Sequence, residues 1–258
     1  MNYAKVRDIT VDEIPVIDVS GLRDADSRQL RAVADQMVMA AEGIGFFYIR
    51  GHGVSRAMLK ETYALSQTFF RSPDDVKDRV AVSGGHRGWL RIGEARMEGS
   101  ERFDLKESFI WGLDVTPDDP DVIAGDRLLA ENRWPATPQG MRDVFNRYFT
   151  EMQSCGEQLL RAFALSLEIP PDYFVRHIDR PVSRAAAVWY PPQPANLGDQ
   201  QFGVSPHTDY GTLTLVQQDA VGGLQVRSRA GDWVTAPPIE DTFVVNVGDL
   251  LARWTNDR

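Results

Sequence analysis

The spacing of hydrophobic positions predicts helices over much of the first two thirds of the chain. Between Gln29 and Ala41 apolar residues recur at i, i+3, i+4, i+7, i+8 and i+11, which predicts an amphipathic helix that Asp26 or Ser27 can cap. A second helix is expected from about Ser55 to Phe70. The same spacing continues from Pro138 to Glu168 for about eight turns, long enough to support a sheet.

Short apolar runs predict strands. Ile14–Val19 reads as an edge strand because Pro15, which cannot donate to a ladder, stands near its start, and Phe46–Ile49 reads as a buried strand. Residues 83–125 are rich in glycine and charge and are expected to form loops with short strands. Five further strands at roughly ten-residue spacing are expected after residue 180, which is typical of an antiparallel sandwich or jelly roll: 185–190, 211–217, 222–226, 232–235 and 243–247.

Composition and charge exclude several classes of partner. The 258 residues (28.9 kDa) carry a net charge of −9 and a pI near 5.0, and no four basic residues run together, so nucleic acid and anionic membranes are not expected partners. No signal peptide or membrane-spanning run is visible. The single cysteine, Cys155, cannot form an internal disulfide. We therefore expect a cytoplasmic protein.

Two His-x-Asp triplets stand among only four histidines. His177-Ile178-Asp179 lies in an expected helical turn, where residues two apart point to nearly opposite sides. His207-Thr208-Asp209 leads into an expected strand, where residues two apart share a face and both side chains can reach one ion. With a second histidine, this pair makes the facial triad of non-haem Fe(II) oxygenases. From the triplet alone, the favoured interpretation is a histidine that is hydrogen-bonded in a strand turn.

The sequence around this triplet resembles the 2-oxoglutarate/Fe(II)-dependent oxygenase superfamily, in its isopenicillin N synthase-like branch. The resemblance covers essentially the whole chain, and the order of its blocks is more specific than any one of them. The blocks are Ile14-Pro15-Val16-Ile17-Asp18, Gly45–Ile49 with Gly51-His52-Gly53-Val54, Arg87-Gly88-Trp89, Lys106-Glu107-Ser108-Phe109, Tyr190-Pro191-Pro192, His207–Leu215, Gly222–Val226 and Asn246–Leu250.

The resemblance implies an α+β fold: a double-stranded β-helix (jelly roll) with a helical N-terminal half and a long supporting helix. The chain is expected to divide into an N-terminal helical and strand region, residues 1–110, and a region with the long helix and jelly-roll core, residues 111–258. The implied cofactors are Fe(II), 2-oxoglutarate as co-substrate and O2. The implied reaction is hydroxylation, desaturation or ring closure of a small organic substrate, which the sequence does not identify. It also leaves the oligomeric state open.

The resemblance assigns roles to three residues. His207 and Asp209 match the first two iron ligands. Tyr190 matches a tyrosine that often touches the co-substrate carboxylate, and the alternative is an aromatic packed inside the sandwich. Alternation along Ala186, Val188 and Tyr190 predicts that these three form an inward-facing set.

Other candidates receive mostly structural interpretations. His52 is expected in a tight bend between two glycines, and His86 in solvent. Trp89 and Arg91 could line the substrate mouth, although an exposed aromatic and a surface charge are the default interpretation. Asn246 is expected to bond neighbouring backbone.

The C-terminal stretch Leu250–Arg258 resembles the segment that leads, in the family, to the distal iron-binding histidine and the cationic anchor of 2-oxoglutarate. No histidine follows Asp209. We therefore expect residues 1–258 to turn over little oxoacid and to expose an unpaired edge and the apolar face of Phe243–Val247. The alternative function is a catalytically incompetent jelly-roll binding module or fragment.

Overall fold

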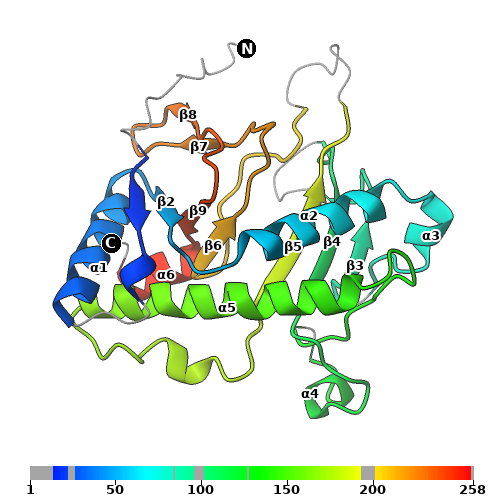
Figure 1. The fold of residues 1–258 in the computed structure, drawn as a ribbon, viewed down its shortest axis with the longest axis horizontal. Helices are drawn as coiled ribbons and strands as arrows, with labels where there is room; N and C mark the ends of the chain where they lie inside the picture. Colours follow the sequence, from blue (N-terminus) through cyan, green and yellow to red (C-terminus); the bar gives the residue numbers. More distant parts are fainter. Residues whose placement is uncertain are drawn as a thin grey trace. The chain divides into compact units, whose positions relative to one another are not determined.

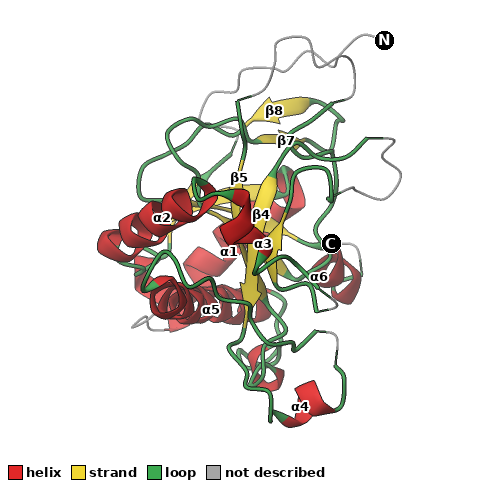
Figure 2. Cartoon of the chain, turned by 90° about the vertical axis from the view of Figure 1, so that its right-hand side faces the viewer, coloured by secondary structure: helices red, strands yellow, loops and turns green. Residues whose placement is uncertain are grey.

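The computed structural model describes residues 14–22, 27–83, 85–95, 102–126, 128–192 and 201–256. The described chain mixes helices and sheets, as expected for the α+β class (Figure 2). It divides into two compact units, each assembled from separate segments. Unit 1 is Met1–Val54, Ser154–Asp179 and Thr208–Arg258, and unit 2 is Ser55–Gln153 and Arg180–His207. The expected division into 1–110 and 111–258 stays a prediction.

The three long predicted helices are present, with ends shifted by up to three residues. Ser55 caps α2, because its hydroxyl accepts a hydrogen bond from the N–H of Met58 at 3.2 Å. The expected cap at Asp26 or Ser27 lies outside the described residues and side chains. The helices are α1 (Ser27–Gly43), α2 (Arg56–Phe70), α3 (Asp74–Asp78), α4 (Pro120–Ile123), α5 (Met141–Ser166) and α6 (Asp249–Trp254), with 3-10 turns η1 (Ser20–Leu22) and η2 (Val175–His177) (Figure 1).

Unit 1 contains a four-stranded sheet in the order β1-β2-β9-β6. Its strands are β1 (Val16–Asp18), β2 (Phe46–Arg50), β6 (Leu213–Val216) and β9 (Phe243–Val247). β1 is an edge strand, as expected, and pairs parallel to β2. β9 pairs antiparallel with both β2 and β6, and Phe243, Val244 and Val245 are buried. The expectation that this strand exposes its apolar face is therefore wrong: Val244 packs in a cluster with Val226 and Val234, and Phe243 packs against His52.

A two-stranded pair, β7 (Gln225–Arg227) and β8 (Trp233–Thr235), completes the strands described in unit 1. Val226 and Val234 are buried in one cluster with Tyr48 and Val244. The hydroxyl of Tyr48 donates to the carbonyl of Pro237 at 2.6 Å, which ties the segment after β8 to β2.

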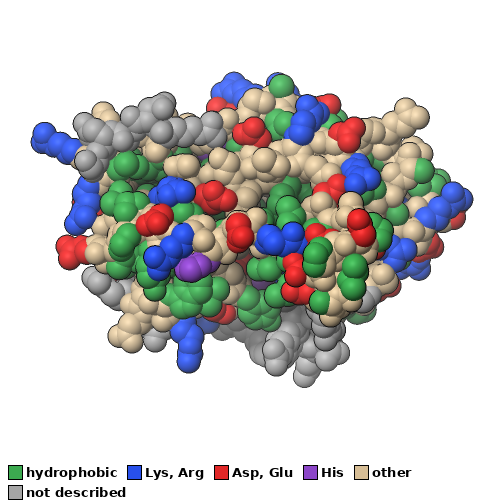
Figure 3. All heavy atoms as spheres, turned by 90° about the horizontal axis from the view of Figure 1, so that it is seen from below, with side chains coloured by type: hydrophobic (Ala, Val, Ile, Leu, Met, Phe, Trp, Pro, Cys, Tyr) green, Lys and Arg blue, Asp and Glu red, His purple; other side chains and the backbone are tan. Residues whose placement is uncertain are grey.

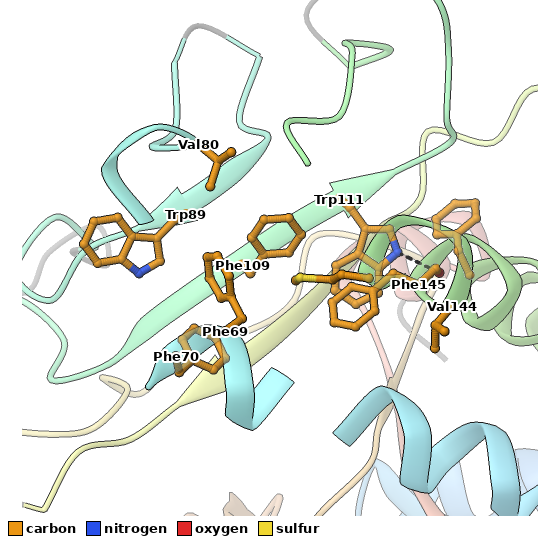
Figure 4. Packing of buried hydrophobic residues seen from close by; sticks show 10 residues of the cluster. Phe69, Phe70, Val80, Trp89, Phe109, Trp111, Val144 and Phe145 are labelled. Atoms are coloured by element: carbon orange, nitrogen blue, oxygen red, sulfur yellow. Dashed lines mark hydrogen bonds between the residues drawn. The ribbon is translucent and has the colours of Figure 1, made fainter. Parts of the chain in front are cut away.

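Unit 2 is built on a three-stranded sheet of β3 (Gly88–Leu90), β4 (Glu107–Gly112) and β5 (Arg184–Trp189), with β4 in the centre. Phe109 and Trp111 of β4 pack with the end of α2 and the first half of α5 in an aromatic cluster (Figure 4). The indole N–H of Trp111 donates to the carbonyl of Phe145 at 3.2 Å. The segment 83–125, expected to be mostly loop, thus supplies the central strand of unit 2.

A buried charge pair lies at one end of β4. Nζ of Lys77 is 3.0 Å from Oε2 of Glu107, and both side chains are buried. The indole N–H of Trp89 donates to the same oxygen. Because buried charges are unfavourable unless paired and hydrogen-bonded, these three side chains depend on one another.

Candidate metal centre

His207 and Asp209 lie in the loop directly before β6, not in a strand. β6 begins only at Leu213, so the same-face argument from strand geometry does not apply to the two residues. That part of the prediction is wrong. Their side chains are instead oriented by hydrogen bonds to other segments of the chain.

His207 is oriented within unit 2. Its Nδ1 lies 2.8 Å from the carbonyl oxygen of Ser205. Since a carbonyl only accepts, Nδ1 carries the proton, and in the neutral ring Nε2 is the nitrogen with the lone pair. The N–H of Ser205 donates at 2.9 Å to Oδ1 of Asp104, whose exposed fraction is 0%, and Oδ2 of Asp104 lies 3.4 Å from Nζ of Lys106. Metal-binding histidines commonly have this kind of support behind the ring.

Asp209 is oriented within unit 1 by β9. Nδ2 of Asn246 donates to its Oδ2 at 2.8 Å. Asn246 is paired with Thr214 of β6. The backbone pairing of β9 with β6 therefore fixes the position from which the Asn246 side chain extends. The expectation that Asn246 bonds neighbouring backbone is wrong. Asn246 stands in one of the blocks that resemble the oxygenase family, and this was the only sign in the sequence of a role at the site. Its contact with Asp209 depends on how the strands pair, which a single sequence does not show.

The backbone around Asp209 is held against the start of α6. The N–H of Asp249 donates to the carbonyl of Asp209 at 2.8 Å, and the hydroxyl of Thr208 donates to Oδ2 of Asp249 at 2.9 Å. A Cβ at Gly248 would lie 2.2 Å from the carbonyl oxygen of Gly211 and 2.8 Å from that of Asp209. Glycine is therefore required at position 248 for this close approach.

Tyr190 follows β5 directly and is 51% exposed. Side chains alternate along β5: Trp189 packs against the aromatic cluster, and Val188 and Tyr190 lie on the other, more exposed face. The expectation that Ala186, Val188 and Tyr190 face inward is wrong, because the opposite set is the buried one. Desolvation by nearby protein atoms still raises the pKa of Tyr190, and the Asp104 carboxylate raises it further. The exposed fraction covers the whole residue, whereas the pKa responds to the surroundings of the hydroxyl.

The other histidines occupy sites unlike that of His207. His52 is buried, its ring centroid lies 4.4 Å from that of Phe243, and its Nδ1 accepts the N–H of Val54 at 3.2 Å, which agrees with the expected structural role. His86 is exposed, as expected. His177 lies in η2, and its Nε2 is 3.1 Å from Nε of Arg176, so this nitrogen accepts from the guanidinium.

Trp89 does not lie at an exposed mouth. Its exposed fraction is 2%, and it packs in the aromatic cluster of unit 2. Arg91 lies with its guanidinium 5.2 Å from the Trp89 ring centroid and pairs with Asp78. Both residues are accounted for by packing and ion pairing.

Within the described residues, no group of three or more His, Cys, Asp or Glu side chains could hold a metal ion. His207 and Asp209 provide one imidazole and one carboxylate, a donor pair that suits Fe(II), and other segments orient both side chains.

Two family models match the chain. Residues 14–137 match the N-terminal region of the non-haem dioxygenases in morphine synthesis, and residues 173–258 match the 2OG-Fe(II) oxygenase superfamily. The 2-oxoglutarate-Fe(II) type oxidoreductase ppzC of Metarhizium rileyi is 36% identical over 272 residues, which cover 98% of this chain and 73% of that protein. The 2-oxoglutarate-dependent dioxygenase citB of Monascus ruber is 34% identical over 251 residues, covering 94% and 76%.

Solved structures agree with these matches. A full-length Neurospora crassa protein in complex with alpha-KG and thymine superposes with a TM-score of 0.83 at 29% identity, over 96% of this chain and 78% of that one. The chain belongs to the 2OG-Fe(II) oxygenase superfamily. It has the family's jelly-roll fold, and the expected cofactors Fe(II), 2-oxoglutarate and O2 are those of this family. The oxygenase is thus favoured over the alternative of a binding module.

Among the helices that the structure describes, none is long and apolar enough to cross a membrane. On the face drawn in Figure 3, acidic and basic side chains are interspersed, and the described residues form no large basic patch there.

Proposed function

We propose that His207 and Asp209 hold the Fe(II) of this 2-oxoglutarate-dependent oxygenase and that Tyr190 contacts the co-substrate. The observation that carries the proposal is the hydrogen bond between Nδ1 of His207 and the Ser205 carbonyl, because it selects the tautomer that presents Nε2 to a metal. Bound iron would supply redox chemistry and sites for chelating 2-oxoglutarate and binding O2.

The residues of the chain then act mainly by positioning. The amide of Asn246 orients the Asp209 carboxylate, and the bond from Asp249 to the Asp209 carbonyl holds the loop. The buried carboxylate of Asp104 fixes the backbone behind His207 through Ser205. These contacts reduce the reorganisation needed when a metal binds.

Tyr190 is proposed to donate its hydroxyl to a carboxylate of 2-oxoglutarate. A tyrosine phenol, with an ordinary pKa near 10, is protonated at neutral pH, and the raised pKa of Tyr190 does not change this, so its hydroxyl can act as a donor. Its position on the exposed face of β5 leaves it accessible to a small molecule.

We further propose a small organic substrate that is hydroxylated, desaturated or ring-closed. Among the relatives, the Neurospora crassa protein was crystallised with thymine, and a 31% identical relative from Glycine max is named homoarginine-6-hydroxylase. Both names indicate small polar molecules. A cytoplasmic location is part of the proposal, since the only cysteine forms no internal disulfide.

The test is a calorimetric titration of the apo protein with Mn(II) or Co(II), which use the same nitrogen and oxygen donors as Fe(II). His207→Ala and Asp209→Ala should each lower metal affinity by at least about tenfold. His177→Ala is the matched control, because His177 belongs to the other His-x-Asp triplet, and it should leave the affinity unchanged. Undiminished affinity in both site variants would overturn the assignment.

A further inference from the structure

A pocket lies wholly within unit 2. Its volume is about 460 Å³, and its lining comes from described residues just before β3 and within 122–126 and 129–133. The lining includes Ser83, Arg87, Asn132 and Arg133, together with the carboxylates of Asp126 and Glu131. Pockets of this size are common for small ligands.

Arg87 is the unusual member of this lining. Its exposed fraction is only 2%, yet no carboxylate of the described residues forms an ion pair with it. Its Nη2 donates to the carbonyl of Leu128 at 2.7 Å, and its Nη1 reaches the carbonyls of Gly85 and His86 at 3.4 Å each. Nε has no hydrogen-bond partner in the described part of the chain. A guanidinium has five N–H donors, so three carbonyls leave two donors unused.

A buried cation without a counter-ion is unfavourable. Desolvation by burial lowers the pKa of Arg87, and repulsion from the nearby Arg184 lowers it further. The site therefore concentrates positive charge in a partly desolvated place.

The guanidinium is also held rigidly in position. A Cβ at Gly112 would lie 2.6 Å from Nη2, 3.0 Å from Cζ and 3.1 Å from Nε of Arg87, so the group lies directly on the Gly112 backbone. Asn132 fixes that backbone with two hydrogen bonds of 2.9 Å, one to the N–H and one to the carbonyl of Gly112. A fixed planar guanidinium is suited to binding an oxyanion.

Arg133 contributes a second cation to the pocket. Its Nη1 donates to Oγ of Ser83 at 2.8 Å and its Nη2 to the carbonyl of Arg79 at 3.2 Å, and no described carboxylate pairs with it. The negative charges of Asp126 and Glu131 repel an anion. Both side chains are exposed, so solvent screens their charges more than it screens the charge of the buried Arg87.

This pocket is separate from the candidate metal centre. Asp104, which supports His207 through Ser205, stands just before the Glu107 end of β4. Arg87 lies on Gly112 at the other end of the same strand. At about 3.3 Å per residue, the length of the strand separates the two ends by roughly 17 Å.

We propose that the Arg87–Arg133 pocket is a second binding site, which takes a small oxyanion, either a carboxylate or a phosphate. The positive charges of Arg87 and Arg133, which both line the pocket, attract the anion. This site does not depend on the iron ligands.

The experiment measures binding of succinate and of inorganic phosphate by calorimetry, with the two probes distinguishing carboxylate from phosphate. It uses metal-free protein carrying His207→Ala, so that the candidate metal centre cannot hold a chelated acid. In this background Arg133→Gln should weaken binding by about three- to tenfold. Glu131→Gln should strengthen it by about two- to fivefold, because it removes an opposing charge at the same pocket.

Arg147→Gln is the matched control. It makes the same charge change on α5, where Arg147 pairs with Glu61, and should leave the affinity unchanged. The paired variants at 133 and 131 keep the test independent of whether a change at buried Arg87 allows folding. Dissociation constants weaker than about 10 mM for both probes, or affinities that respond equally at 133 and 147, would overturn the proposal.

Discussion

Gly248→Ala tests whether the loop that carries Asp209 is held in place by close backbone contact. Gly248 has φ −91° and ψ 170°, values that any residue adopts, so alanine suffers no backbone strain there. By itself such a change would slightly stabilise the protein through the unfolded state. The opposing effect is steric, since the new Cβ meets the carbonyl oxygens of Gly211 at 2.2 Å and Asp209 at 2.8 Å.

The magnitude follows from these distances. Both lie under 3.0 Å, below the range that real Cβ contacts show, and the atoms met are backbone rather than flexible side chain. The loop or the start of α6 must therefore move by about 1 Å, at a cost of roughly 1–3 kcal/mol, as for other overpacked sites. The same movement strains the hydrogen bond from the N–H of Asp249 to Asp209, so metal affinity should fall by about tenfold.

Thermal unfolding and a Mn(II) titration measure the two effects on one sample. Gly211→Ala is the matched control in the same loop: its Cβ would meet no atom within 4 Å, so both readouts should stay near wild type. If Gly248→Ala unfolds at the wild-type temperature and binds metal normally, the loop is not fixed by this contact and the reasoning fails.

Three further changes address other parts of the chain. Asn246→Ala should lower Mn(II) affinity by about 10- to 100-fold through lost orientation of Asp209, and a normal titration would contradict this role. Tyr190→Phe should weaken 2-oxoglutarate binding by about 0.5–1.5 kcal/mol, or up to roughly 3 if the partner is a carboxylate; an unchanged dissociation constant would exclude the contact. Burial alone would raise the pKa of Asp114, but hydrogen bonds led by those from Arg142 outweigh it and lower the pKa. Asp114 therefore stabilises the fold above its unfolded pKa of about 4, and this stabilisation is lost as pH falls through the native value. Asp114→Asn should cost roughly 2–4 kcal/mol at pH 7 and progressively less in acid, as urea unfolding at several pH values would measure.

Most of the secondary structure could be predicted because it depends on local patterns. The spacing of apolar residues placed α1, α2 and α5, and short apolar runs placed β2 and β9. The central place of β4 could not be predicted, because it comes from pairing with β3 and β5, which lie far apart in the chain, and its burial comes from packing against α2 and α5. Its residues are buried on both faces, so no alternation in the strand itself shows which side faces the core.

The candidate site shows the same limit. The triplet His207-Thr208-Asp209 was visible in the sequence, but the argument from strand geometry was not correct, since both residues lie in a loop. The contacts that orient them, from Asn246 and through Ser205 to Asp104, join positions 37 and 101 residues apart in the chain. A single sequence carries no signal for such pairs.

The buried group of Lys77, Glu107 and Trp89 restricts how this sequence can change over evolutionary time. Replacing Lys77 alone leaves Glu107 buried without its cation, at a cost of about 3–5 kcal/mol, and replacing Glu107 alone leaves the buried Lys77 with the exposed Asp74 as its counter-ion. Replacing both by apolar residues of similar volume can be neutral or stabilising. Two tolerated sequences are thus separated by intermediates that fold poorly. Positions 77 and 107 should consequently vary together among descendants of this chain, and a library that mutates them singly would miss the apolar solution.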